Sequence, residues 1–166
     1  MRQIIVEKYE DLYLIMSADS ESCIEKLLKN SYKLETDWVY DEFLQLYKEW
    51  SDYDVVLRFA LVSDLWNSNI KLLSYTNAVV SHDNVIKEEY LYLSTVETNP
   101  HEKGKKYCSL LMDFIKRICI EHKINKIVLE NEGGYIAYLC YKHLGKIIEE
   151  HEDENKTRLV ISVFIE

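Results

Sequence analysis

Proline and glycine are scarce in this chain, which has one proline and four glycines in 166 residues. This composition excludes collagen-like sequence and the Pro- or Gly-rich linkers that commonly join separate domains. Internal repeats and low-complexity stretches are missing as well. We therefore expect residues 1–166 to form a single domain, in which each glycine marks a position with a special backbone requirement.

Long hydrophobic runs are also missing. No apolar run approaches the roughly 20 residues that a membrane-spanning helix needs, and the N-terminus becomes charged at Glu7 and Lys8, too soon for a secretory signal. The 48% apolar and 30% charged residues are typical of globular proteins. The sequence predicts an intracellular, cytoplasmic protein without a membrane partner.

The sequence has few cysteines, and their spacing matches no metal-binding motif. The four cysteines are Cys23, Cys108, Cys119 and Cys140. They form no C-x-x-C pair and have no histidine at zinc spacing, and H-E-x-x-H is missing too. Each falls on the apolar face of an expected helix, so we predict buried, reduced thiols and no metal. His143, on the apolar side of the last expected helix, is predicted to be packed in the core.

Basic residues are few relative to acidic ones: the chain has 20 Lys and Arg and 29 Asp and Glu, which gives a net charge of −9. A nucleic-acid-binding surface needs clustered basic residues, so the sequence predicts no nucleic-acid partner. The charge suits a cationic partner such as an amine, a polyamine or a lysine-rich segment. Solubility alone is an equally good explanation.

The first half of the chain predicts a strand, two helices and three further strands. Residues 3–16 form a strand with a turn at Glu10-Asp11, and the helices cover roughly 22–32 and 37–50. The chain then contains three runs of β-branched and aromatic residues, which are typical of strands. They cover residues 54–63, 70–81 and 89–98. Short polar breaks between them predict an antiparallel meander.

The second half begins at Pro100 and Gly104, which end the third of these strands. A strongly amphipathic helix follows at 105–122, and a strand at 126–130 must then be parallel to 89–98. A helix with Ile136, Leu139 and Leu144 on its apolar stripe ends near Gly145. Two last strands, 146–151 and 158–165, flank a polar turn.

This order, β-α-α-β-β-β-α-β-α-β-β, predicts an α/β fold of the α+β sandwich type. Its mixed, mostly antiparallel sheet would carry helices on both faces. The apolar strand 158–165 can be internal or a dimer edge, so the protein is expected to be a monomer or a homodimer.

The segment from Val96 to Cys108 has the features of a phosphate-binding turn. Here a strand ends, the chain turns through Gly104, and a long helix begins. The unpaired N–H groups and the dipole of a helix N-terminus attract phosphate, and three lysines add positive charge. These are Lys103, Lys105 and Lys106. A solvated loop is the alternative interpretation.

The element order and this turn resemble the Gcn5-related N-acetyltransferases over essentially the whole chain. The pyrophosphate loop of that family reads (Q/R)-x-x-G-x-(G/A), and the matching residues here are 101–106, HEKGKK. The glycine fits at Gly104. His101 and Lys106 depart from the pattern, and Lys106 either crowds the bend or contacts a phosphate.

A second stretch resembles the family motif N-x-x-A-x-x-x-Y-x-x-L-G. Ala137, Tyr141, Leu144 and Gly145 match it, while Gly134 occupies the asparagine position and Asn131 lies nearby. In relatives the matching tyrosine protonates the departing CoA thiolate. The resemblance therefore makes Tyr141 the candidate general acid.

The resemblance further implies acetyl-CoA as the acetyl donor, bound between two diverging strands and the glycine-containing loop. The implied cofactor-binding residues are Thr95, Val96, Glu97, His101, Glu102, Lys103, Gly104, Lys105, Lys106, Tyr107 and Asn131. The general base is left open between Glu88 and Glu130. Glu88 shares the strand parity of Tyr90, the position of a glutamate in many relatives, whereas Glu97 has the opposite parity.

The implied reaction is direct transfer of the acetyl group to a primary amine of a small molecule, peptide or protein. Aromatic and acidic residues of 37–47, including Trp38, Tyr40 and Tyr47, are candidates to hold a cationic amine. The alternative is a non-catalytic CoA-sensing or protein-binding module, which the unusual residues His101 and Lys106 favour.

Overall fold

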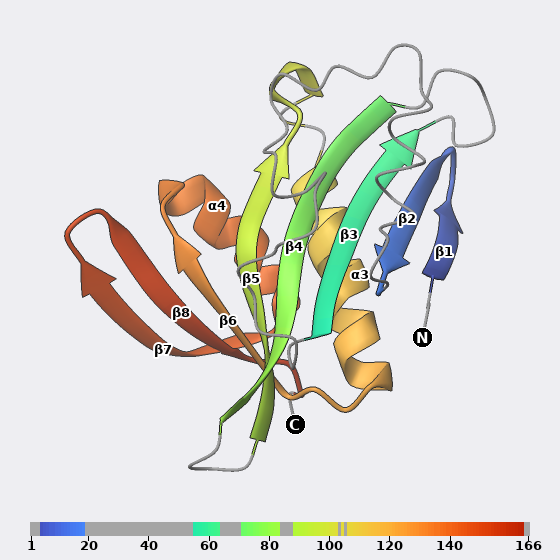
Figure 1. Cartoon of the computed structure of the whole chain (residues 1–166). Helices are drawn as coiled ribbons and strands as arrows, with labels where there is room; N and C mark the ends of the chain where they lie inside the picture. Colours follow the sequence, from blue (N-terminus) through green and yellow to red (C-terminus); the bar gives the residue numbers. More distant parts are fainter. Residues whose placement is uncertain are drawn as a thin grey trace.

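Figure 1 shows the computed structural model of the chain, which describes residues 4–18, 55–63, 71–83, 88–102, 104 and 106–164. These residues form an eight-stranded sheet with the order β1-β2-β3-β4-β5-β6-β8-β7. The strands are β1 Ile4–Tyr9, β2 Leu12–Ser17, β3 Val55–Ser63, β4 Lys71–Asp83, β5 Glu88–Thr98, β6 Lys126–Asn131, β7 Lys146–Asp153 and β8 Lys156–Ser162. The helices are α3 Tyr107–Glu121 and α4 Gly134–Tyr141, with 3-10 turns η1 Pro100–Glu102 and η2 Lys142–Leu144.

The meander and the crossover are confirmed. β3, β4 and β5 pair antiparallel in sequence order, and β5 pairs parallel with β6 after α3 has crossed between them. The expected N-terminal strand is instead a hairpin of β1 and β2, because the turn at Glu10 and Asp11 reverses the chain. Glu10 takes the positive φ of 54° that so tight a turn requires.

The main core lies between the sheet and α3. Leu57, Phe59 and Leu61 of β3 point to this face, and the Phe59 and Phe114 rings meet edge-on at 6.1 Å between centroids. α4 lies over the same face, beside β6 (Figure 1). The opposite face is buried too, at Val62 and Tyr75. The helices expected at 22–32 and 37–50 lie outside the described residues.

The C-terminal strand is internal rather than an edge. β8 pairs with β6 on one side and with β7 on the other. The edge is therefore β7, whose residues 149–153 are exposed and mostly acidic. Charged side chains on an edge strand oppose pairing with another chain.

The predicted apolar stripe of the last helix is confirmed at Cys140 and Leu144 and wrong at Ile136 and Leu139. Ile136 and Leu139 are 83% and 44% exposed, whereas Cys140, Tyr141 and Leu144 are buried. His143, expected in the core, is also exposed, with Nδ1 3.3 Å from Oδ1 of Asp113. In so short and apolar a helix both faces satisfy the helical period, and only the position of α3 decides which one is buried.

Candidate functional site

β5 and β6 separate halfway along their length. They are paired from Tyr90–Lys126 to Leu93–Leu129, after which β5 continues along β4 and β6 continues along β8. Figure 1 shows the two strands diverging toward the end that carries α4. The backbone of β5 beyond Leu93 thus turns one edge toward the diverging strand.

A β-bulge at Ser94 marks the point of divergence. Asn77 of β4 opposes Thr95 while the next residue, Ala78, opposes Leu93, so Ser94 is an extra residue in β5. Its hydroxyl donates a hydrogen bond to the carbonyl oxygen of Asn77 at 3.3 Å. Bulges bend a strand and redirect the side chains that follow, which separates β5 from β6 here.

The bulge also changes the face on which Glu97 lies. Before the bulge, Leu91 and Leu93 point to the α3 side; after it, Val96 does so. Glu97, opposite Tyr75, therefore lies on the same face as Tyr90 and Tyr92. The expectation from strand parity that Glu97 faces the other way is wrong, because one inserted residue reverses the alternation.

The two predicted general bases lie far apart. Glu88 is at the start of β5, about 16 Å along the strand from Leu93, and its Oε2 is 3.0 Å from Nζ of Lys126. Glu130 lies beside the divergence, with Oε2 3.0 Å from Nζ of Lys156. The pKa of Tyr92 is raised, mainly because its side chain is partly buried and secondly because of the negative charge of Glu130. Only Glu130 of this pair is brought to the divergence.

The loop from β5 to α3 is anchored by Asn99, which the sequence analysis did not single out. Its side chain is buried, donates to the Leu72 carbonyl oxygen at 3.1 Å, and accepts the His101 N–H at 3.0 Å. The Asn-Pro dipeptide at 99–100 was the available signal, since it is typical of turns. Thr98 adds a second contact to β4, with its hydroxyl 3.3 Å from that of Ser74.

Two residues with positive φ then lead into α3. Gly104 has φ 88° and Lys106, at the N-cap position, has φ 62°. The cap lacks a side-chain hydrogen bond, so the first N–H groups of α3 are available to an anion. Lys106 and His101 are exposed, while Lys103 and Lys105 lie outside the described residues. Tyr107 is half-buried against the core.

Tyr141 reaches the core from the last turn of α4. Its side chain is 7% exposed, and burial, followed by the carboxylates of Glu97 and Glu132, raises the pKa of its hydroxyl to about 12. The hydroxyl therefore stays protonated throughout the physiological range. The carboxylate of Glu97, on β5 beyond the bulge, thus acts on the Tyr141 hydroxyl of α4 by raising its pKa.

Asn131 holds the start of α4. Its Nδ2 donates to the Gly134 carbonyl oxygen and its Oδ1 accepts the Gly133 N–H, each at 3.0 Å. A Cβ on Gly133 would lie 2.8 Å from that of Ala137, so the turn requires glycine. Asn131, predicted to bind the cofactor, uses its side chain to fix the turn that precedes α4.

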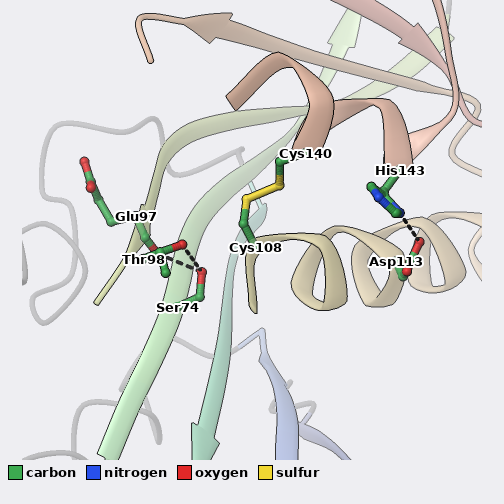
Figure 2. Close-up of a disulfide and its surroundings, with 7 residues drawn as sticks. All are labelled: Ser74, Glu97, Thr98, Cys108, Asp113, Cys140 and His143. Atoms are coloured by element: carbon green, nitrogen blue, oxygen red, sulfur yellow. Dashed lines mark hydrogen bonds and ion pairs between the residues drawn. A yellow bond between two sulfur atoms is a disulfide. The ribbon is translucent and has the colours of Figure 1, made fainter. Parts of the chain in front are cut away.

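Cys108 and Cys140 form a disulfide (Figure 2), which corrects the prediction of reduced thiols. The sequence placed each cysteine on an apolar helix face but did not show that the two faces meet. α3 and α4 pack together so that the two Cα atoms are 6.1 Å apart, within the range of protein disulfides. Cys119 is buried and free, and Cys23 lies outside the described residues.

Metal and membrane features are not found in the part of the chain that the structure describes. There, no three His, Cys, Asp or Glu side chains are grouped to hold a metal ion. None of the described helices is long and apolar enough to span a membrane.

Solved structures share this arrangement of strands and helices. One chain of the NatC complex bound to a Gag peptide and CoA matches 90% of this chain and 98% of its own length, with a TM-score of 0.54 and 17% identity. The chain has the fold of the Gcn5-related N-acetyltransferases. The expected mixed, mostly antiparallel α/β sheet is thereby confirmed.

Two further structures of this acetyltransferase fold match less of the chain. A KacTA–DNA complex matches 65% of this chain and 68% of its own, with a TM-score of 0.49 and 20% identity. The PaiA N-acetyltransferase of Thermoplasma acidophilum in complex with coenzyme A matches 64% of this chain and 60% of its own, with a TM-score of 0.49 and 14% identity. No protein-family model and no curated protein sequence matches the chain. The expectation of no nucleic-acid partner stays a prediction.

Proposed function

We propose that this protein is an acetyl-CoA-dependent N-acetyltransferase that transfers the acetyl group to a primary amine. The observation that carries the proposal is the divergence of β5 and β6 beside a buried, protonated Tyr141. The unpaired backbone edge of β5 beyond Leu93 and the Tyr141 hydroxyl would then serve one site. The net charge of −9 favours a cationic amine, which can belong to a small molecule, a peptide or a protein.

The residues around the start of α3 fit the diphosphate of acetyl-CoA. The first N–H groups of α3 lack a side-chain cap, and the space that a Cβ of Gly104 would occupy is open within 4 Å. Backbone groups of this kind bind phosphate at helix N-termini. Acetyl-CoA supplies the acetyl group as a thioester whose carbonyl accepts attack by an amine. The β5 backbone near Val96 is then positioned to hydrogen-bond to the pantetheine arm.

Tyr141 and Glu97 divide the proton transfers between them. An amine attacks only as the free base, so a carboxylate must remove its proton. We assign this role to Glu97, because the bulge turns it to the face opposite α3 and its charge acts on Tyr141. Tyr141 donates its proton to the thiolate as the carbon–sulfur bond breaks. The amine then approaches from the face opposite α3.

The first test is calorimetric titration of the purified protein with acetyl-CoA, using two substitutions at one position. Gly104→Asp places a carboxylate in the phosphate-binding turn, and juxtaposed like charges should weaken binding by roughly tenfold or more. Gly104→Ala imposes the same backbone strain at φ 88° without the charge and should change Kd by less than about threefold.

The titration also separates the enzyme from its alternative. Binding by the parent that Gly104→Asp abolishes supports the donor site, and thiol release with an amine then supports catalysis. Binding without turnover on any amine favours the CoA-sensing module. A folded parent that binds no acetyl-CoA excludes both. Peptides with a free N-terminus belong in the amine screen beside polyamines, since the NatC structure contains a peptide with CoA.

The assignment of the base predicts that Glu97→Gln lowers kcat/KM by on the order of 10²-fold, because an amide does not accept the proton of the amine. The loss should shrink as pH rises and the free amine becomes more abundant. Glu88→Gln is the matched control, since Glu88 pairs with Lys126 at the far end of β5. Equal losses in Glu97→Gln and Glu88→Gln would contradict the assignment, and a loss confined to Glu130→Gln would transfer the role to Glu130.

A further inference from the structure

The Cys108–Cys140 disulfide joins the two parts of the proposed site. Cys108 is the second residue of α3, two positions after Lys106 in the turn that leads into the helix. Cys140 directly precedes Tyr141 at the end of α4. Figure 2 shows the bond spanning the start of α3 and the end of α4. The covalent link therefore fixes the distance between the anion-binding turn and the acid.

α4 is a short helix whose start is held by Asn131 and whose end carries the disulfide. It has eight residues, about two turns, and isolated helices of that length are unstable in water. Tyr135, Ile136 and Leu139 are exposed on it, while only Cys140 and Tyr141 within it are buried. The nearby pair of His143 and Asp113 is half exposed, and such pairs contribute little. The disulfide is thus a principal tie between α4 and α3.

The two cysteines of the disulfide differ in exposure. Cys140 is 8% exposed, whereas Cys108, at the start of α3, is only partly buried. Thiol–disulfide exchange requires a thiolate to reach a sulfur atom. Cys119 is an unsuitable partner for exchange, because burial raises its pKa to about 12 and so suppresses the thiolate. Reduction should proceed from outside, through Sγ of Cys108.

We propose that the Cys108–Cys140 disulfide is a redox-sensitive tie that holds Tyr141 in its catalytic position, so that the oxidised protein is active and the reduced protein is impaired. This inference rests on the proposed function. A dithiol reductant attacks Sγ of Cys108, and Cys140 leaves as a thiolate that takes up a proton. The second thiol of the reductant then displaces Cys108, which is also protonated. The reductant becomes a disulfide, and two electrons and two protons pass to the protein.

The test is a redox titration of the whole protein in buffers of oxidised and reduced dithiothreitol. Acetyl transfer should fall about tenfold on reduction, because a displaced acid no longer meets the leaving group. Activity should follow the fraction of linked Cys108–Cys140 peptide measured by mass spectrometry, and reoxidation should restore it. Cys119→Ser should keep the response, whereas Cys108→Ser/Cys140→Ser should stay at the reduced level in every buffer.

A second measurement does not depend on catalysis or on a variant that folds. Amide hydrogen exchange of 134–141 should quicken on reduction of the parent, while 111–119 of α3 keeps its protection. Unchanged exchange and activity in a protein that binds acetyl-CoA would overturn the redox tie and leave the proposed function standing. Faster exchange without acetyl-CoA binding in either state would instead refute the proposed function and leave the disulfide as a tie of α4 without a catalytic role.

Discussion

Tyr141→Phe is expected to lower kcat for acetyl transfer by on the order of 10³-fold, because it removes the hydroxyl that protonates the departing thiolate. Phenylalanine fills the same buried volume, so the fold and the acetyl-CoA Kd should change little. Steady-state kinetics and calorimetry on the same preparation separate these effects. The signature of a lost acid is a fall in kcat with nearly constant Kd.

The dependence of the transfer rate on pH also tests whether Tyr141 is the acid. Burial and the charges of Glu97 and Glu132 raise the Tyr141 pKa from 10.0 to about 12. A raised pKa keeps the proton on the hydroxyl, so the acid stays competent as pH increases. The rate should rise with pH as the amine is deprotonated and then level off. A falling limb that begins below about pH 9 would assign the acid to another group.

Tyr138→Phe is the matched control for this substitution. Tyr138 lies on the same helix, and its exposed hydroxyl donates a hydrogen bond to Oε1 of Glu150 on β7 at 2.8 Å. The control should keep kcat within about twofold of the parent, as surface substitutions usually do. Similar losses in both variants would show a general effect on α4, and an active Tyr141→Phe would remove Tyr141 from the mechanism.

The period of the apolar residues was enough to predict much of the sheet. β3, β4 and β5 each appear as a run of β-branched and aromatic residues, and their ends agree with the structure to within two residues. The long α3 between two strands required a parallel crossover, because a connection of this kind joins strands that run in the same direction. These inferences depend only on the local residue pattern and on the order of the elements along the chain, and both can be read from the sequence.

The site depends on features that local sequence does not encode. The bulge at Ser94 adds one residue to an otherwise regular alternation, and nothing at that position distinguishes it from a paired residue. Parity therefore favoured Glu88, at the end of β5 that lies far from the divergence, and turned Glu97 away. The disulfide likewise depends on how α3 and α4 pack, which the sequence separation of 32 between Cys108 and Cys140 does not reveal.

Gly145→Ala should cost about 3–5 kcal/mol of unfolding free energy, the largest stability effect that we expect from adding one methyl group. A Cβ at Gly145 would lie 2.1 Å from the carbonyl oxygen of Ser162 and 2.9 Å from its carbonyl carbon. These atoms belong to the backbone of β8, which cannot retreat, because β6 and β7 hold it from both sides. The positive φ of 155° adds strain for any side chain.

Gly104→Ala separates the two contributions to that loss. It has a positive φ of 88° but open space within 4 Å of the added Cβ, so it should cost only about 1 kcal/mol. Denaturant unfolding with an unchanged m value measures both variants on one scale. If the two variants lose equal stability, strain alone is responsible and the contact with Ser162 is not. A larger loss at Gly145 means that its contact with β8 holds the end of η2, three residues after Tyr141.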